Sequence, residues 1–301
     1  MAFSATDAAF EGFRVVRRHP MALIFWALFY AVMMIAALAL VGGSIIGLMN
    51  AAEGLESSGA TSPEAFMPVI ASYLAVLAVI LPVSLIASAM IYAAVARAVL
   101  HPSESAFGYL RLGMDEVRVL VVSIVLAIVF MVLSVVVFGV IGIAAGVTAA
   151  ADMPALWLLV VLLGLAGFAL LIWLAVRLSL AVPITMAERR ISIFGSFAVT
   201  KGRFWPLLGM SLLAIIMSFV VSLLGSLVAM PLQLLAGGLD GLAQLDGESL
   251  PAILQAAWPA ITIWIVINAV MSALQVAVVY APFSAAYRDI KGGNPSAEVF
   301  G

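Results

Sequence analysis

Long apolar runs separated by short polar connections make up most of this chain. A helix needs about 20 apolar residues to cross the roughly 30 Å hydrocarbon core of a bilayer. Six runs are long enough: 21–49, 67–100, 117–147, 155–187, 204–235 and 252–287. Pro82, Pro183 and Pro282 lie inside such runs. They are tolerated in a membrane, because neighbouring helices satisfy the carbonyls that proline leaves free. The pattern predicts an all-α polytopic membrane protein with six transmembrane helices.

The first apolar run has a second interpretation, a cleaved signal peptide. Arg14, Arg17 and Arg18 resemble the basic region of such a peptide, and the Ala-Leu-Ala tripeptide at 37–39 resembles a cleavage site. The apolar stretch before that site already exceeds the about 7–15 residues of a signal core, and it continues to Met49. We therefore expect an uncleaved first helix.

Composition and charge support the membrane assignment and orient the helices. Of 301 residues, 66% are apolar and 9% charged, whereas soluble domains average roughly 45–50% and about 25%. The connections after the first, third and fifth runs carry acidic residues and no Lys or Arg. Every basic residue except Arg177 lies in a terminus, in one of the other two connections, or at the end of a run that adjoins one of these. By the positive-inside rule, both termini are expected in the cytoplasm.

Three segments that precede the odd-numbered runs share a pattern that predicts an internal repeat. Aligned without gaps, they match at Phe10/Phe107/Phe194, Phe13/Leu110/Phe197 and Val15/Leu112/Val199. The repeat units, about 4–100, 101–190 and 191–291, are each expected to hold one amphipathic cytoplasmic helix and one hairpin, all in parallel orientation. They form a single integral membrane domain over 1–301, with a flexible tail at 292–301. Alternatively, any amphipathic segment ahead of a membrane helix shows apolar residues at i and i+3.

Basic side chains in and beside these segments are candidates for contact with lipid headgroups. They are Arg14, Arg17, Arg18, Arg189, Arg190, Lys201 and Arg203. A basic residue beside an anionic leaflet contributes about 1 kcal/mol to membrane attraction. The alternative is ordinary charge that sets topology without recognising a particular lipid.

Arg177 is the one charge well inside an apolar run, and intramembrane charges are candidate functional residues. In an unbroken helix it would lie about 18 Å deeper than Arg189, near mid-membrane, although Pro183 between them favours a bend. Its guanidinium could bind a phosphate group bidentately between helices. Alternatively, the side chain extends along the helix toward the interface.

Asn268, Ser272 and Gln275 form a polar stripe in the sixth run, at positions i, i+4 and i+7. This spacing places them on one helix face. The stripe either lines a solute path or, as we favour, supplies hydrogen bonds between helices. Glycine pairs at 43/47 and 142/146 have the spacing of small-residue contacts between helices.

Little in the sequence indicates catalysis. Asp115 and Glu116 are adjacent and point about 100° apart on a helix, so a solvated face is expected rather than an acid–base pair. His19 and His101 have no second ligand at metal-binding spacing, and the chain contains no Cys. No hydrolase, zinc-protease or nucleotide-binding motif occurs. We expect no enzyme activity, no cofactor, no metal and no nucleic-acid partner.

The segment from Arg177 to Gly209 resembles the membrane domain associated with glycerophosphoryl diester phosphodiesterases and related bacterial inner-membrane proteins. The resemblance rests on Arg177-Leu178-Ser179-Leu180-Ala181, on Pro183 and on Thr200-Lys201-Gly202-Arg203-Phe204-Trp205. It implies a multi-helix protein of the bacterial inner membrane. Catalysis in that family belongs to a separate soluble domain, for which this chain, ending at Gly301, is expected to have no room. No catalytic residue is carried over.

Together these features predict a non-enzymatic inner-membrane protein that interacts with lipids or partner proteins and supports envelope homeostasis. The alternative is a transporter for a lipidic or amphiphilic solute, which would use Arg177 and the polar stripe.

Overall fold

The computed structural model describes residues 4–59, 62–151, 156–235 and 250–292. Except for Gly292, the tail predicted at 292–301 lies outside the described residues. The described chain is helical and contains no strand, as the sequence predicts. Its helices are α1 (Ala5–Ala9), α2 (Glu11–Arg18), α3 (Pro20–Ser58), η1 (Pro63–Phe66), α4 (Met67–Leu100), η2 (Ala106–Tyr109), α5 (Met114–Ala151), α6 (Trp157–Leu178), α7 (Ala181–Glu188), α8 (Gly195–Val199), α9 (Phe204–Leu235) and α11 (Leu250–Gly292).

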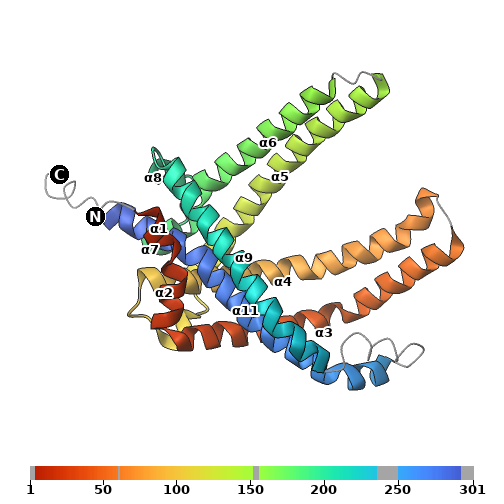
Figure 1. Cartoon of the computed structure of the whole chain (residues 1–301), viewed down its shortest axis with the longest axis horizontal. Coiled ribbons are helices and arrows are strands. Elements are labelled where there is room, and N and C mark those ends of the chain that lie inside the picture. Colours follow the sequence, from red (N-terminus) through yellow and green to blue (C-terminus); the bar gives the residue numbers. More distant parts are fainter. Residues whose placement is uncertain (1–3, 60–61, 152–155, 236–249, 293–301) are drawn as a thin grey trace.

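The six predicted transmembrane helices are confirmed. Each of α3, α4, α5, α9, α11 and the stretch of α6 with α7 is long and apolar enough to cross a bilayer. The chain is therefore an integral, multi-pass membrane protein. Its long helices pair as three hairpins, α3–α4, α5–α6 and α9–α11, which spread apart from a common end (Figure 1). The short helices α1, α2, α7 and α8 lie at that end, which we call the hub.

The buried core lies in the hub, and α11 runs through its centre. Five alanines at every fourth position of α11 are each at most 2% exposed: Ala269, Ala273, Ala277, Ala281 and Ala285. Small side chains let helix backbones approach closely, which favours helix association in a bilayer. This alanine stripe allows α11 to pack against α2, α3, α4 and α9.

The helices α2 and α11 approach closely at Gly12. A Cβ atom there would lie 2.5 Å from the carbonyl oxygen of Ala277 and 2.5 Å from the Cα of Val278. Both are backbone atoms, so only glycine fits without moving a helix. In contrast, a Cβ at positions 43, 47, 142 or 146 would meet nothing within 4 Å. The prediction that these glycine pairs make helix contacts is therefore wrong for the described chain.

Away from the hub the hairpins are largely exposed. Along α5, every residue after Val122 except Thr148 is exposed or half-buried. Its partner α6 buries only Val160 before its last turn. Because these surfaces are almost entirely apolar, they suit contact with lipid rather than with water.

The fourth predicted helix is broken near the hub. α6 ends at Leu178, and α7 begins three residues later at Ala181. Pro183 lies in the first turn of α7, where backbone N–H groups have no intrahelical acceptor and a missing N–H costs little. Pro282 lies inside α11 and does not interrupt that helix.

The three segments aligned as a repeat have different conformations. The first holds α1 and α2, and the third holds the five-residue α8. In the second, an amphipathic helix is predicted, but the structure has a short 3₁₀ turn in which Phe107, Gly108 and Tyr109 have positive φ. This turn brings the carbonyl of Gly108 to within 2.7 Å of the indole nitrogen of Trp26. The three aligned phenylalanines are all exposed: Phe10 is 49%, Phe107 73% and Phe194 72% exposed.

Candidate functional site

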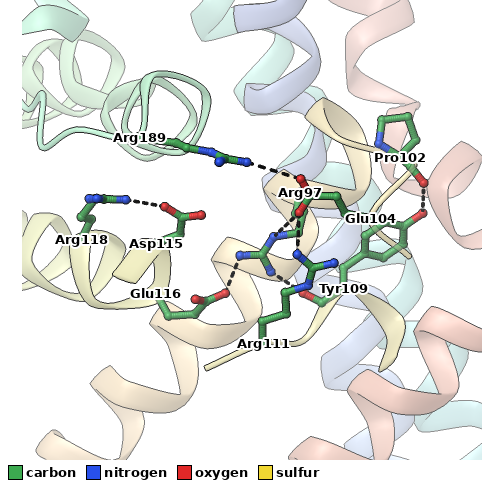
Figure 2. Close-up of polar contacts among 9 residues, drawn as sticks. All are labelled: Arg97, Pro102, Glu104, Tyr109, Arg111, Asp115, Glu116, Arg118 and Arg189. Atoms are coloured by element: carbon green, nitrogen blue, oxygen red, sulfur yellow. Dashed lines mark hydrogen bonds and ion pairs between the residues drawn. The ribbon is translucent and has the colours of Figure 1, made fainter. Parts of the chain in front are cut away.

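A buried ion pair joins the second and third long helices in the hub. Arg97, near the end of α4, is 3% exposed, and its Nη2 donates to Glu116 Oε1 on α5 at 2.5 Å. Its Nη1 donates to the Tyr109 carbonyl at 2.5 Å (Figure 2). Arg97 thus fixes the turn between these helices as well as the helices themselves.

The structure corrects the prediction for Glu116, one of the two adjacent carboxylates. A solvated face is expected for Asp115 and Glu116, but Glu116 is 6% exposed because it faces Arg97 across the turn. Asp115 points elsewhere and pairs with Arg118 at 2.5 Å (Figure 2). The Arg97–Glu116 charges satisfy each other, which is the arrangement of a structural link rather than of a reactive site.

Glu104 extends the network to the surface of the hub. Its carboxylate accepts from Arg111 at 2.7 Å and from Arg189 at 3.4 Å (Figure 2). Arg189 follows α7, so the pair links the second and fourth connections of the chain. A predicted headgroup residue, Arg189, is therefore also part of an ion pair within the protein.

Arg177 lies at the end of α6, against α8, and not halfway along a continuous helix. Its Nη1 donates to the carbonyl of Phe197 and to the hydroxyl of Thr200, both at 3.3 Å. The guanidinium carbon lies 5.7 Å from the ring centre of Trp173 and 5.9 Å from that of Phe197. The unbroken helix from which a mid-membrane depth is expected is not present, because α6 ends one residue after Arg177.

The predicted polar stripe lines a groove between α9 and α11. Asn268, Ser272 and Gln275 form one wall, and Ser222 and Ser226 of α9 lie in the other. The groove has a volume of about 460 Å³. The amide of Asn268 donates to the Trp264 carbonyl of its own helix at 2.9 Å. In the described chain, the side chains of Ser272 and Gln275 make no hydrogen bond, so the interhelical bonds expected of the stripe are not present there.

The predicted headgroup residues divide into two sets. Arg14 pairs with Asp7 and Glu11, Arg189 with Glu104, and Arg190 with Glu188. Among the described residues, no ion pair holds the other four, all of them exposed: Arg17, Arg18, Lys201 and Arg203. The structure thus leaves these four available for ligands outside the protein.

An apolar cavity lies where the hairpins meet, at a place that no local sequence pattern indicates. It is about 380 Å³ in volume and takes its lining from α4, α5, α6, α11 and the α6–α7 region. Tyr92 and Tyr280 stack at one wall with ring centres 3.9 Å apart, and their hydroxyls hydrogen-bond at 2.7 Å. Ser123, Ser179 and Ser284 add further hydroxyl groups to the lining. The tyrosine pair joins residues far apart in the chain, which hydropathy alone does not reveal.

The cavity has the character of a site for an amphiphile. Ligand pockets are typically about 300–1,000 Å³, mostly apolar, with a few polar groups that orient the ligand. No cluster of three metal-ligating side chains occurs within the described ranges. His19 packs edge-on against Tyr109 with ring centres 5.5 Å apart, which is a packing role.

Comparison with protein-family models, with curated proteins and with solved structures finds no match to this chain. The resemblance of residues 177–209 to the membrane domain of glycerophosphoryl diester phosphodiesterases therefore stays a prediction.

Proposed function

We propose that this protein is a non-enzymatic protein of the bacterial inner membrane that holds a lipid between its helical hairpins, with the hub on the cytoplasmic side. The orientation follows from the basic residues, which gather at the hub. Partner proteins of the membrane are the alternative occupants of the same exposed surfaces.

The observation that carries this proposal is the cavity at the junction of the hairpins. Its lining comes from all three hairpins, and the Tyr92–Tyr280 pair offers hydroxyl groups within an otherwise apolar wall. A lipid chain fits such a lining, since it buries apolar surface while an ester or hydroxyl meets the few polar groups. The hairpins spread apart from the hub (Figure 1), and in this proposal the lipid enters from the bilayer between them.

Native mass spectrometry of the gently solubilised protein tests the proposal. Ala175 lines the cavity from an exposed position on α6, so Ala175→Trp fills space without entering the packed core. The wild type should carry bound lipid, and this variant should lose it.

Ala169→Trp is the matched control, because Ala169 is an exposed residue on the same helix outside the cavity lining. It should retain lipid as the wild type does. Equal lipid retention by both tryptophan variants would contradict lipid binding in the cavity.

A second candidate function, movement of an amphiphilic solute across the bilayer, is favoured by the polar groove between α9 and α11. Gln275 precedes Arg288 by 13 residues, which places it about 20 Å from the basic end of α11. Polar side chains at this depth are costly in hydrocarbon and are typical of solute pathways. The serines on α9 extend the polar lining to both walls.

Transport is tested in proteoliposomes by following a fluorescent phospholipid from one leaflet to the other. Gln275→Leu should slow the transfer, because it replaces a polar wall of the groove with an apolar one. Thr262→Val is the control on the same helix, since the Thr262 hydroxyl bonds its own helix and lies outside the groove. Transfer at the wild-type rate in Gln275→Leu would refute the pathway.

A further inference from the structure

Five basic side chains form no ion pair in the described part of the chain, and three of them surround α8. The eight other Lys and Arg residues each lie within 4.0 Å of a carboxylate oxygen. The five are Arg17, Arg18, Arg177, Lys201 and Arg203. The segment around α8 is therefore a concentration of positive charge that the protein does not neutralise.

The sequence explains this imbalance. No acidic residue occurs between Glu188 and Asp240. In the first aligned segment, by contrast, Glu11 and Asp7 bind Arg14, and in the second, Glu104 binds Arg111. In the third segment neither Lys201 nor Arg203 has a counter-ion among the described residues, whereas the first segment pairs Arg14 and leaves Arg17 and Arg18 unpaired.

Arg177 is held in place with one edge of its guanidinium unused. Nη1 bonds Phe197 and Thr200, and the Ser196 hydroxyl donates to the Arg177 carbonyl at 2.6 Å. Nε is buried without a hydrogen-bond partner, and Nη2 makes no hydrogen bond to the described residues. A charged donor left without an acceptor costs free energy. Nη2 is therefore the charged donor that remains for an acceptor outside the protein, because Nε is closed off from solvent.

Neighbouring side chains place this cluster at the level of lipid headgroups. Lys201 directly follows Thr200, and Arg203 donates to the Val199 carbonyl at 3.4 Å, so both cations lie beside α8. Phe194 is 72% and Trp205 76% exposed on either side of them. Exposed aromatic residues next to basic ones are typical of the membrane–water interface.

We infer that Arg177, Thr200, Lys201 and Arg203 form a binding site for the phosphate of an anionic phospholipid headgroup. Arg177 supplies a charged N–H donor at Nη2, the hydroxyl of Thr200 holds its guanidinium in place, and the two exposed cations compensate the net charge. The site is separate from the apolar cavity. Residues 175 and 177 point about 200° apart around α6, so Ala175 faces the cavity while Arg177 faces α8. The inference therefore stands or falls independently of the lipid proposed there.

Binding of a short-chain phosphatidylglycerol to the full chain in a neutral detergent tests this site, with phosphatidylcholine of the same length as the comparison. Arg177→Lys keeps the charge and removes the guanidinium that Phe197 and Thr200 hold in place. Affinity for phosphatidylglycerol should therefore fall about 10- to 100-fold, as expected for losing a charge-assisted hydrogen bond. Wild-type affinity in this variant would overturn the inference.

A matched pair of double variants separates the site from general charge attraction. Lys201→Gln/Arg203→Gln and Arg17→Gln/Arg18→Gln each remove two exposed, unpaired cations, but only the first pair lies beside Arg177. The first should weaken binding, and the second should leave it near the wild-type value. Equal loss in both would overturn the site in favour of non-specific attraction. Because these four residues are exposed, the comparison remains decisive if Arg177→Lys fails to fold.

Inorganic phosphate identifies the source of the anion. Millimolar phosphate should not displace phosphatidylglycerol, because the acyl chains and the exposed aromatic residues add contacts that the free ion lacks. Full displacement by phosphate, or equal affinity for phosphatidylcholine, would contradict recognition of an anionic lipid.

Discussion

Replacing Arg97 with methionine should strongly destabilise the hub. The substitution leaves the carboxylate of Glu116 buried without its cation, and the Tyr109 carbonyl loses its 2.5 Å donor. Removing one partner of a buried ion pair typically costs about 3–5 kcal/mol. The free energy of unfolding should fall by that amount.

The double variant Arg97→Met/Glu116→Leu distinguishes two costs: the loss of the ion pair itself, and the burial of an unpaired carboxylate. Replacing both partners with apolar residues is often close to neutral, and the unpaired Tyr109 carbonyl should still cost about 1–3 kcal/mol. The double variant should therefore be more stable than Arg97→Met alone, even though it carries one more substitution.

Arg118→Met is the matched control on α5. Its ion pair with Asp115 is as short as the buried one, at 2.5 Å, but the two side chains are 29% and 25% exposed. A pair that water reaches is worth about 0–1 kcal/mol. Burial, rather than the length of the ion pair, thus decides the expected difference.

Denaturant unfolding in mixed micelles, followed by tryptophan fluorescence or circular dichroism, measures these differences. The order of stability should be wild type, Arg118→Met, the double variant and Arg97→Met. Arg97→Met within about 1 kcal/mol of the wild type would refute the reasoning, because an unpaired buried carboxylate would then cost almost nothing.

Three further predictions test packing, the turn and the topology. Gly12→Val should lower the free energy of unfolding by at least about 1–3 kcal/mol, because its Cβ meets the α11 backbone at 2.5 Å. Gly43→Val, which has open space around it, should leave that free energy nearly unchanged. Equal effects of the two variants in a thermal melt would contradict the close approach. Trp26→Phe should lower the free energy of unfolding by about 1–3 kcal/mol, because it leaves the Gly108 carbonyl without its 2.7 Å donor. An unchanged free energy of unfolding would refute that role. Glu56→Cys, a lone cysteine in a chain without any, should react with an impermeant thiol reagent from the periplasmic side, and cytoplasmic labelling would reverse the proposed orientation.

The long helices could be predicted because hydrophobic length is a local property of the sequence. All six spans agree with the structure, including the prolines that α4 and α11 tolerate. The five alanines of α11 recur at a spacing of four and are an equally local signal of a packing face. Hydropathy does not single them out, because alanine is abundant in every one of the apolar runs.

The site residues were harder to predict because their environment is set by distant parts of the chain. Glu116 is buried through Arg97, 19 positions away, and no local pattern distinguishes it from the more exposed Asp115. Tyr92 and Tyr280 are 188 positions apart, so their pairing depends on how the hairpins meet. The helix that carries Arg177 is interrupted for a local reason, since α6 ends at Leu178 and Pro183 lies in the first turn of α7.

A cryo-electron microscopy map of the protein in lipid nanodiscs would show whether a lipid lies where the spreading hairpins meet. Elongated density should lie inside the cavity, running from the Tyr92–Tyr280 pair toward Phe130 on α5. A map in which the α5–α6 hairpin closes against α4 and α11, so that protein side chains fill this space, would contradict this expectation.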